Sequence, residues 1–560
     1  MASSDARCRH AASGPSLPGL RNGDACGVDE HLKDACRDQG QATGSASPGD
    51  HNHCSDPSTE FPCGPHTALS SNGAPLENGL HDKHRQSVEA HEQRGKVFRP
   101  RSSLLDEMLL VNHIRTIYHI FLAVLLLMAV ASLILDILRH GRLLPDISFV
   151  ISCFGKLHLV ALTWGAMFVA TLLVPYGALH AWARAWSLLL PRRGARPGAE
   201  LRGRARPGAE LRGWALARSS PLLAGTLSAA CALPYVAFVL LVLGVLPVWV
   251  SVAHVLPPAS RFILILEQVR FVMKAHAFVR DNVPRVALSV HPQGQRPNWS
   301  LPSISQYLYY LFCPSLIYRD SYPRNTSIRW DYVRTKLAEM ACIFVYGHFI
   351  FQCLVVPLFQ DVQREPLTLE RLVLYVCHAM VPGTLLFIIT FFAFLHCWLN
   401  LFGELMRFAD RMFYKDWWNS RSFANYYRTW NVVVHDWLYT YFYGDLIRVF
   451  SRRHRRAAML IVFIFSAIVH EYVFTVCFGL FCPVMLFLFI CFGMVLNFLL
   501  HDGRSNDVWN IFMWFALILG QGVLVTLYSL EWSALRHCPS KPETVWEFIT
   551  PQFWSCYASR

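Results

Sequence analysis

The sequence predicts an all-α, polytopic membrane protein with about nine transmembrane helices, and three observations support this prediction. First, 53% of the 560 residues are hydrophobic, only 16% are charged and the mean hydropathy is +0.30, which is not the composition of an ordinary soluble protein. Second, apolar runs such as 117–137 and 221–252 reach the roughly 20 residues that a helix needs to cross a bilayer core. Third, the first hundred residues are polar and hold 8 of the 24 His and 5 of the 17 Cys, so the apolar residues are concentrated in the rest of the chain.

Residues 1–95 are predicted to be a disordered cytosolic tail. They are rich in Gly, Ser, Pro, Asp and His and show no sustained apolar period. No basic-then-apolar signal sequence follows Met1, which favours an N-terminus in the cytosol. The cluster of His51, His53 and Cys54 lacks the paired spacing of a zinc site, so no metal is expected.

The membrane domain, residues 96–560, begins with Lys96, Arg99 and Arg101, where the tail is expected to meet the membrane. Eight apolar segments of this domain are predicted to cross the bilayer. They are 114–137, 150–176, 221–252, 337–360, 369–400, 457–480, 483–500 and 509–530.

A ninth candidate span, 260–279, carries Glu267, Arg270 and Lys274 on one helical face. Two interpretations are open: an amphipathic helix on the membrane surface, or a span whose charged face turns toward a polar interior. With a cytosolic N-terminus, nine crossings would place the C-terminus in the lumen and eight would place it in the cytosol.

The connecting segments carry the topology signals. The Arg-rich segment 190–218, which contains the sequence ARPGAELRG twice, is predicted to be a cytosolic insert by the positive-inside rule, and the basic cluster 448–456 should also be cytosolic. The C-terminal tail, 531–560, carries Cys538 and Cys556, which would pair in an oxidising lumen and therefore favour nine crossings. Two unrelated thiols are the alternative.

The segment 411–445 combines aromatic, polar and basic residues in a chain otherwise made of apolar helices. An interfacial belt of Trp and Tyr would explain its aromatic residues. It would not explain the asparagines, His435 and Asp436 between them, because polar groups near a membrane need protein or water as partners. Cations in and after this segment could neutralise the phosphates of an acyl-CoA donor: Lys415, Arg428, Arg452, Arg453 and Arg455.

His470 lies in the middle of the apolar sequence FIFSAIVHEYVFTVC, with Ser466 one helical turn before it and Glu471 beside it. An ionisable residue at this depth in a membrane is by default a candidate for function. A histidine buried there is expected to be neutral and able to accept a proton. Histidine and a fixed amide are the minimal equipment for acyl transfer to an alcohol.

Other motifs carry little weight. The pattern from His276 to Asp281 matches HxxxxD, which arises easily by chance, and no P-loop, GxSxG, HExxH or dinucleotide-binding glycine motif is evident. The net charge of +13 comes from basic residues between apolar segments rather than from a nucleic-acid-binding module, so no nucleic acid partner is expected.

The sequence FYKDWWN at 413–419 resembles the FYxDWWN motif of the membrane-bound O-acyltransferase family, in the branch that esterifies sterols and diacylglycerol. Its fixed positions are Phe413, Tyr414, Asp416, Trp417, Trp418 and Asn419. Further stretches are similar to sterol O-acyltransferases, and the similarity covers roughly residues 95–560. These stretches are 257–285, 391–400, 424–439 and 466–472.

This resemblance implies a multi-pass enzyme of the endoplasmic reticulum membrane, with its helices enclosing an intramembrane catalytic chamber. The implied reaction transfers a long-chain fatty acyl group from acyl-CoA to the 3-hydroxyl of cholesterol and forms cholesteryl ester and CoA. Acyl-CoA is then a co-substrate and no cofactor is expected. The family also implies a homodimer or homotetramer.

The resemblance also implies roles for individual residues. His470 corresponds to the catalytic base and Asn431 to an assisting amide. The implied acyl-CoA contacts are Asn425, Arg428, Asn431, His435, Tyr443 and Ser466, with Arg455 in the place of the family's lysine. His113 matches a sterol-contacting histidine, and His396 a second histidine of functional interest. Cys538 and Cys556 match a lumenal disulfide, which supports nine spans with 260–279 among them.

Two alternatives remain. A diacylglycerol O-acyltransferase would share FYxDWWN and the same chemistry, although the sequence TWNVVVHDWLY at 429–439 is of the sterol type. A non-enzymatic lipid transporter would also use polar residues inside the membrane, but it typically shows paired internal repeats with broken helices, which the sequence lacks.

Overall fold

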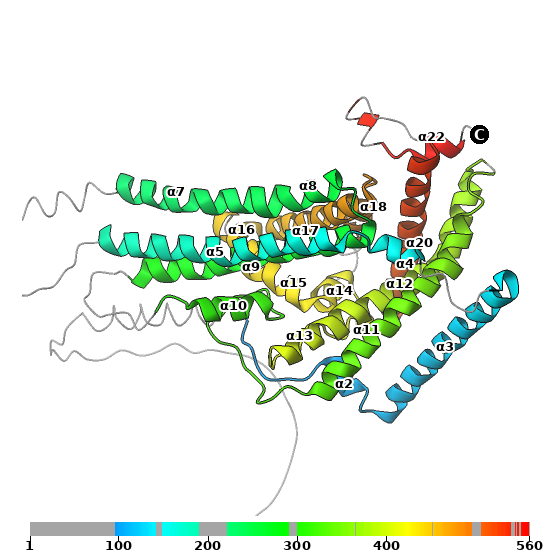
Figure 1. Ribbon diagram of the computed structural model, residues 1–560, viewed down its shortest axis with the longest axis horizontal. Coiled ribbons are helices and arrows are strands. Elements are labelled where there is room, and N and C mark those ends of the chain that lie inside the picture. Colours follow the sequence, from blue (N-terminus) through cyan, green and yellow to red (C-terminus); the bar gives the residue numbers. More distant parts are fainter. Residues whose placement is uncertain are drawn as a thin grey trace, which may run out of the picture. The chain divides into compact units, whose positions relative to one another are not determined.

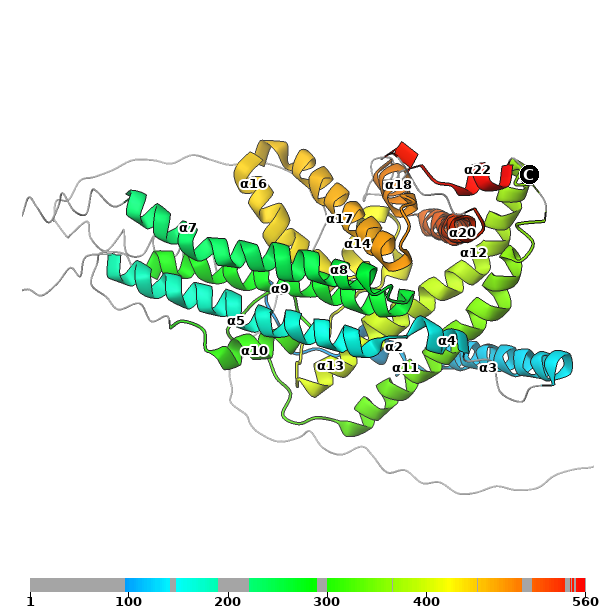
Figure 2. The same ribbon diagram turned by 45° about the horizontal axis from the view of Figure 1, so that its top comes forward.

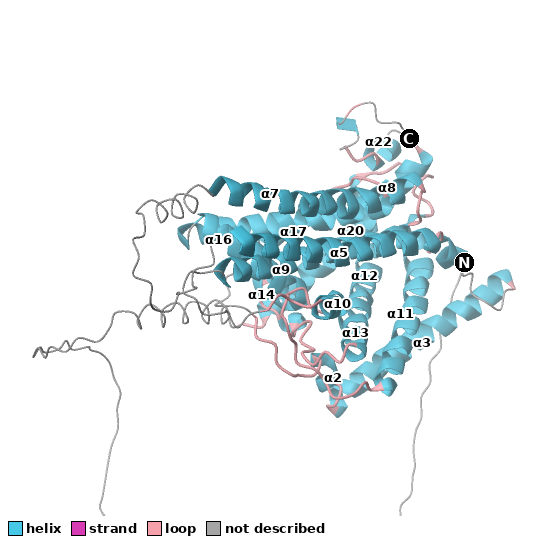
Figure 3. Cartoon of the chain, turned by 60° about the vertical axis from the view of Figure 1, so that its left-hand side comes forward, coloured by secondary structure: helices cyan, strands magenta, loops and turns pink. Residues whose placement is uncertain are grey.

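The computed structural model describes residues 96–141, 148–189, 221–289, 300–364, 366–450, 452–495, 506–538, 544, 546–547 and 550–558. These residues form helices and loops, with isolated β-bridges but no β-strand, so the all-α prediction is confirmed for this part of the chain (Figures 1 and 3). The predicted tail 1–95 and the predicted insert 190–218 lie outside the described residues.

Seven helical stretches in the described residues are long and apolar enough to cross a membrane, and all seven overlap predicted spans. They are Asn112–Ala131, Val150–Trp186, Gly225–Ala253, Trp330–Phe359, Leu369–Leu405, Arg455–Phe478 and Val508–His537. The predicted span 483–500 begins as α18 (Val484–Phe487) and the π-helix η8 (Leu488–Met494), and its last residues lie outside the described ranges. A multi-pass membrane protein is therefore confirmed, whereas the count of nine stays a prediction.

The remaining candidate span, 260–279, lies within the long helix α9 (Pro258–Ser289). This helix packs against both α5 (Leu157–Leu189) and α17 (Arg455–Phe478). Figures 1 and 2 show it running alongside α5. Leu264, Ile265 and Phe271 are fully buried, so α9 is a core helix and not an amphipathic helix on the membrane surface.

The charged face of α9 turns toward the C-terminal end of α10 (Ile304–Phe312). Lys274 Nζ donates to the carbonyls of Tyr310, Cys313 and Ser315 at 2.5, 2.8 and 3.0 Å. Arg270 also donates to a carbonyl at this end, that of Leu311, at 2.7 Å. Carbonyl groups at the end of a helix have no partner within the helix, so these two cations complete the end of α10.

A second group of helices contains α11 (Trp330–Ile350), α12 (Leu369–Phe391) and α20 (Val508–His537). Two glycines let α12 and α20 approach closely, because a Cβ at Gly522 would lie 2.6 Å from the carbonyl oxygen of Val376 and one at Gly383 would lie 3.0 Å from that of Gln521. The other elements are α2 (Leu104–Met108), α3 (Asn112–His140), α4 (Ser148–Cys153), α7 (Pro221–Ala237), η1 (Phe238–Val245), α8 (Leu246–Ala253), η2 (Phe351–Val355), η3 (Val356–Phe359), η4 (Phe392–Trp398), α13 (Leu399–Leu405), η5 (Trp417–Asn419), α14 (Phe423–Trp430), α15 (Val432–Trp437), η6 (Leu438–Tyr443), α16 (Gly444–Phe450), η7 (Arg452–His454) and α22 (Phe553–Ala558).

The C-terminal residues fold back over the end of α20. Cys538 and Cys556 form a disulfide with a Cα–Cα distance of 6.0 Å, which confirms the predicted pairing. The buried carboxylate of Glu531 accepts hydrogen bonds from the backbone N–H groups of Gln552 and Phe553. These contacts fasten the start of α22 to α20.

Candidate active site

The FYKDWWN segment packs its apolar residues inward and holds the backbone around Asn431. The Trp417 ring lies 5.1 Å from Phe391 and 4.7 Å from Trp430, measured between ring centroids. The N–H of Val432 donates to the carbonyl of Phe413 at 2.9 Å. The N–H of Lys415, which follows Phe413 by two residues, donates to the carbonyl of Thr429 at 2.8 Å. These two backbone hydrogen bonds lie on either side of Asn431 and fix its position.

Asn431 lies at the junction of α14 and α15. Its Oδ1 accepts the backbone N–H of Val434 at 3.1 Å, so the side chain caps the N-terminus of α15. An amide carries two donor hydrogens on its nitrogen, and Asn431 Nδ2 has no hydrogen-bond partner among the described residues. The cap therefore orients an amide that can donate to a ligand.

His470 is exposed on α17, and its ring is oriented by two contacts. Its Nδ1 lies 2.7 Å from the carbonyl oxygen of Ser466, one turn earlier. Because a carbonyl can only accept, Nδ1 carries the proton, and in the neutral ring Nε2 is then a free proton acceptor. The Phe489 ring lies against the imidazole at a centroid distance of 4.9 Å.

Glu471, the sequence neighbour of His470, is bound to other groups. Its carboxylate accepts the backbone N–H of Leu486 and the hydroxyl of Tyr528, each at 3.1 Å. The side chain is buried. Glu471 thus joins α17 to α18 and α20 through these two partners.

The residues with implied acyl-CoA contacts lie on consecutive short helices. Asn425 Nδ2 donates to Ser420 Oγ at 3.0 Å, and Arg428 is exposed on the same helix, α14. His435 and Tyr443 belong to a ladder of nearly parallel rings with Tyr439 between them. In the ladder, the ring centroids of His435 and Tyr439 are 6.2 Å apart and those of Tyr439 and Tyr443 are 5.4 Å apart.

Aromatic contacts join these helices to the helix of His470. Tyr427 of α14 lies 5.6 Å from Phe489, the residue that contacts the His470 ring. Phe442 of η6 stacks on Phe465 of α17 at 4.4 Å. The structure therefore brings α14, η6 and the His470 helix together, with Arg455 exposed at the start of that helix. Ser466 contacts His470 through its backbone carbonyl group.

His396 lies in a separate polar network. It is fully buried, its Nδ1 lies 2.8 Å from Tyr414 Oη, and Lys336 Nζ donates to its Nε2 at 2.8 Å. The Ser103 hydroxyl joins the same network, 3.0 Å from Tyr414 Oη. His113 lies elsewhere, exposed at the start of α3. Among the described residues, His396 bonds to Ser103, Lys336 and Tyr414, none of which lies on α17, the helix of His470.

Sequence reasoning missed the contribution of residues 96–106, which it interpreted only as the point where the tail meets the membrane. Lys96 forms an ion pair with Asp436 at 2.8 Å. Partial burial opposes ionisation of Asp436, but the adjacent His435 and the charge of Lys96 together hold the pKa of this carboxyl below its ordinary value. Three basic residues within six positions could have indicated acidic partners in the protein.

Comparison with known proteins agrees with this architecture. Residues 229–530 match the model of the membrane-bound O-acyltransferase family. Sterol O-acyltransferase 2 of Mus musculus is 47% identical over 483 residues, which are 86% of this chain and 85% of the relative. Sterol O-acyltransferase 1 of Chlorocebus aethiops is 46% identical over 481 residues, 86% of this chain and 81% of the relative. The chain therefore belongs to the membrane-bound O-acyltransferase family, among its sterol O-acyltransferases.

Proposed function

We propose that this protein transfers a long-chain fatty acyl group from acyl-CoA to the 3-hydroxyl of cholesterol, in the membrane of the endoplasmic reticulum. Relatives named sterol O-acyltransferase, 46–47% identical over most of the chain, support the reaction class. The observation that carries the mechanism is the orientation of His470, whose Nδ1 contact with Ser466 leaves Nε2 as a proton acceptor.

In the proposed mechanism, His470 Nε2 takes the proton of the sterol hydroxyl as its oxygen attacks the thioester carbonyl carbon. Asn431 Nδ2 donates to the negative charge that develops on the acyl oxygen. Collapse of this tetrahedral species breaks the C–S bond, and the departing CoA thiolate takes the proton from the imidazolium. The histidine is then neutral again, and no covalent acyl-enzyme forms.

We assign the substrate contacts as follows. The exposed Arg428 and Arg455 would neutralise CoA phosphates, since guanidinium groups bind phosphate well. Asn425, His435, Tyr443 and Ser466 would complete the acyl-CoA site, and His113 would contact the sterol. His396, which contacts Ser103 of the N-terminal segment and Tyr414 of the FYKDWWN segment, would act by joining these two segments.

The proposed orientation places the N-terminus in the cytosol and the C-terminus in the lumen. The disulfide between Cys538 and Cys556 supports it, because disulfides persist in oxidising compartments. A homodimer or homotetramer is proposed from the family resemblance.

The function is tested with purified protein in mixed micelles, given oleoyl-CoA with cholesterol or with diacylglycerol in parallel. We expect cholesterol-dependent ester formation and no stable acylated protein. Turnover only with diacylglycerol would change the acceptor but keep the mechanism. Acyl-CoA binding without turnover on either acceptor would favour a transport role, and a competent acylated protein intermediate would contradict direct transfer.

A further inference from the structure

Residues 96–106, named here the N-terminal strap, lie along the segment that leads into the FYKDWWN motif. Arg101 holds the buried Asp410 with two hydrogen bonds, from Nε at 2.6 Å and from Nη2 at 3.0 Å. The N–H of Arg101 donates to Ala409 at 3.0 Å, and the N–H of Arg411 donates to Arg101 at 3.1 Å. A bidentate pair with backbone hydrogen bonds on both sides is a firm anchor.

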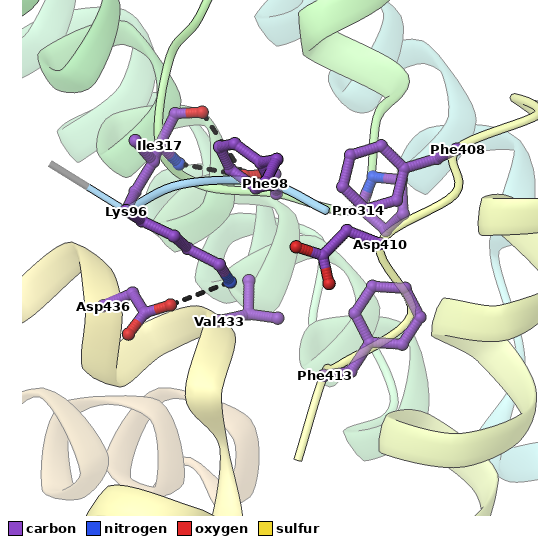
Figure 4. A pocket seen from close by; sticks show the side chains of 10 residues that line it. Lys96, Phe98, Pro314, Ile317, Phe408, Asp410, Phe413, Val433 and Asp436 are labelled. Atoms are coloured by element: carbon purple, nitrogen blue, oxygen red, sulfur yellow. Dashed lines mark hydrogen bonds and ion pairs between the residues drawn. The ribbon is translucent and has the colours of Figure 1, made fainter. Parts of the chain in front are cut away.

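The first residue of the strap reaches the proposed acyl-CoA site. Lys96 Nζ lies 2.8 Å from Asp436 Oδ2, and the other oxygen of this carboxylate lies 3.6 Å from Nδ1 of His435. Figure 4 shows Lys96 extending from the strap toward Asp436, with Asp410 on the far side of a small cavity. One carboxylate therefore lies between the strap and the imidazole.

The ring of His435 is the first of the three rings of the ladder. His435 and Tyr439 are within 12° of parallel, and Tyr439 and Tyr443 are within 17°. Tyr439 is 61% exposed, so the ladder is accessible from outside the protein. A change in the orientation of the His435 ring would alter the end of a ladder that contains two of the proposed acyl-CoA contacts.

The cavity beside Lys96 is too small to hold the substrate. Its volume is about 10 Å³, which is about the space of a single water molecule. A bound acyl-CoA is far larger than this space, so the cavity itself is not an acyl-CoA site. The contact of Lys96 with Asp436 is the one that leads toward the site.

We propose that Lys96 is a positioning residue for acyl-CoA binding, which acts through Asp436 to hold the ring of His435. This inference rests on the proposed acyl-CoA contact of His435. Lys96 thus supports the substrate site from a position more than three hundred residues earlier in the chain.

The test compares two variants of Lys96 in the full-length protein. Lys96→Met keeps the aliphatic part of the side chain but removes the charge, and we expect it to raise the KM for oleoyl-CoA about fivefold, as for a partly exposed ion pair. The kcat and the KM for cholesterol should stay unchanged. Lys96→Arg, which keeps the charge, should restore a KM near that of the wild type.

Arg99→Met is the matched control, because the contact of Arg99 with Asp410 is made by its backbone N–H and its side chain is exposed. This variant should behave as the wild type. Asp436→Asn should raise the KM as Lys96→Met does, and the double variant should show no further increase, because both changes remove the same interaction.

Three results would overturn the proposal. The first is an unchanged KM in Lys96→Met, and the second is a fall in kcat and in thermal stability in place of the KM change. The third is an additive effect in the double variant. His435→Ala separates the two proposals: if it raises the KM while Lys96→Met does not, the strap inference alone fails, and if it leaves the KM unchanged, the acyl-CoA contact of His435 fails and the inference with it.

Discussion

At the residue scale, the adjacent residues His470 and Glu471 of α17 have different roles. A helix with 3.6 residues per turn turns neighbouring side chains about 100° apart. His470 is exposed and uses Nδ1 to bind the carbonyl of Ser466, while Glu471 is buried and accepts hydrogen bonds from Leu486 and Tyr528. We therefore assign the carboxylate to packing and the imidazole to proton transfer.

This division predicts different results from two substitutions of Glu471. Glu471→Gln keeps one acceptor oxygen and should retain most of the esterification activity. Glu471→Ala leaves the backbone N–H of Leu486 without its partner and should lower the stability by about 1–3 kcal/mol. Thermal unfolding of the purified proteins, read beside kcat, checks both, and a well-folded but inactive Glu471→Gln protein would show that the charge takes part in the chemistry.

The ion pair of Lys96 with Asp436 predicts a pH dependence of stability. The folded protein holds the pKa of Asp436 below its ordinary value, so the ionised carboxylate stabilises the fold, fully above the ordinary aspartate pKa of about 4. As the pH falls through and below that value, the unfolded chain takes up the proton first and the stabilisation is lost. The difference in melting temperature between the wild type and Asp436→Asn should thus shrink with acid, and a difference that grows would contradict this account.

Residue identities in the candidate site could be inferred from sequence where a motif carried them, as for His470 and Asn431. Their partners could not, because hydrogen bonds depend on packing between distant segments. The carbonyl of Ser466 as the partner of His470, the Asn431 cap and the pairing of Lys96 with Asp436 emerged only from the structure.

At the scale of the element, the FYKDWWN motif separates into two sets of side chains. Phe413, Tyr414 and Trp417 are buried in the aromatic core, and Asp416 and Asn419 are exposed. The carbonyl of Trp418 also accepts hydrogen bonds from Asn510 and Trp514 of α20. The motif is therefore a structural element that fixes the surroundings of Asn431 and docks on a membrane helix.

Substitutions in the motif should follow this separation. Trp417→Ala removes a large buried ring and should cost about 3–5 kcal/mol of stability. Asp416→Ala and Asn419→Ala should change the stability by less than about 0.5 kcal/mol, because neither side chain is buried. Melting temperatures measured by fluorescence-detected gel filtration provide the comparison, and equal losses in all three proteins would contradict the assignment.

Elements were predictable where they are long and apolar, and less so where packing decides. Seven of the predicted spans agree with apolar helices, since length and hydropathy alone specify them. The candidate 260–279 stayed ambiguous because its charged residues suit either environment. The carbonyls at the end of α10, which bind Arg270 and Lys274, come from a later part of the chain and show what the charged face contacts, whereas a crossing of the bilayer by α9 stays a prediction.

At the scale of the whole molecule, the C-terminal end of α20 is closed by a disulfide and a buried carboxylate. Replacing both Cys538 and Cys556 with serine should lower the stability by about 3 kcal/mol, as expected for a loop of this size. The contacts of Glu531 with the start of α22 should keep the local fold. We expect esterification at moderate temperature to persist with a lower melting temperature, whereas an inactive but equally stable protein would contradict a stabilising role.

The architecture of the described chain followed largely from composition and apolar runs, and the disulfide from the family resemblance. The position of the N-terminal strap against residues 408–436 did not follow, because segments so far apart in sequence leave no local pattern for such a contact. In the whole molecule, the helices hold His470, whose Nδ1 is bound to the carbonyl of Ser466, beside the elements proposed to bind acyl-CoA; we therefore assign its Nε2 as the proton acceptor.

The most direct test of this claim is single-turnover esterification by the His470→Ala protein, with preformed oleoyl-CoA complex and cholesterol. His537→Ala is the matched control. Like His470, His537 has its Nδ1 2.7 Å from the carbonyl oxygen of a serine four residues earlier, but it lies at the end of α20 next to the disulfide. We predict that His470→Ala binds acyl-CoA normally but transfers the acyl group about 10²–10⁴-fold more slowly, and that His537→Ala matches the wild type. Acyl transfer at the wild-type rate in folded His470→Ala protein would contradict the assignment of the base.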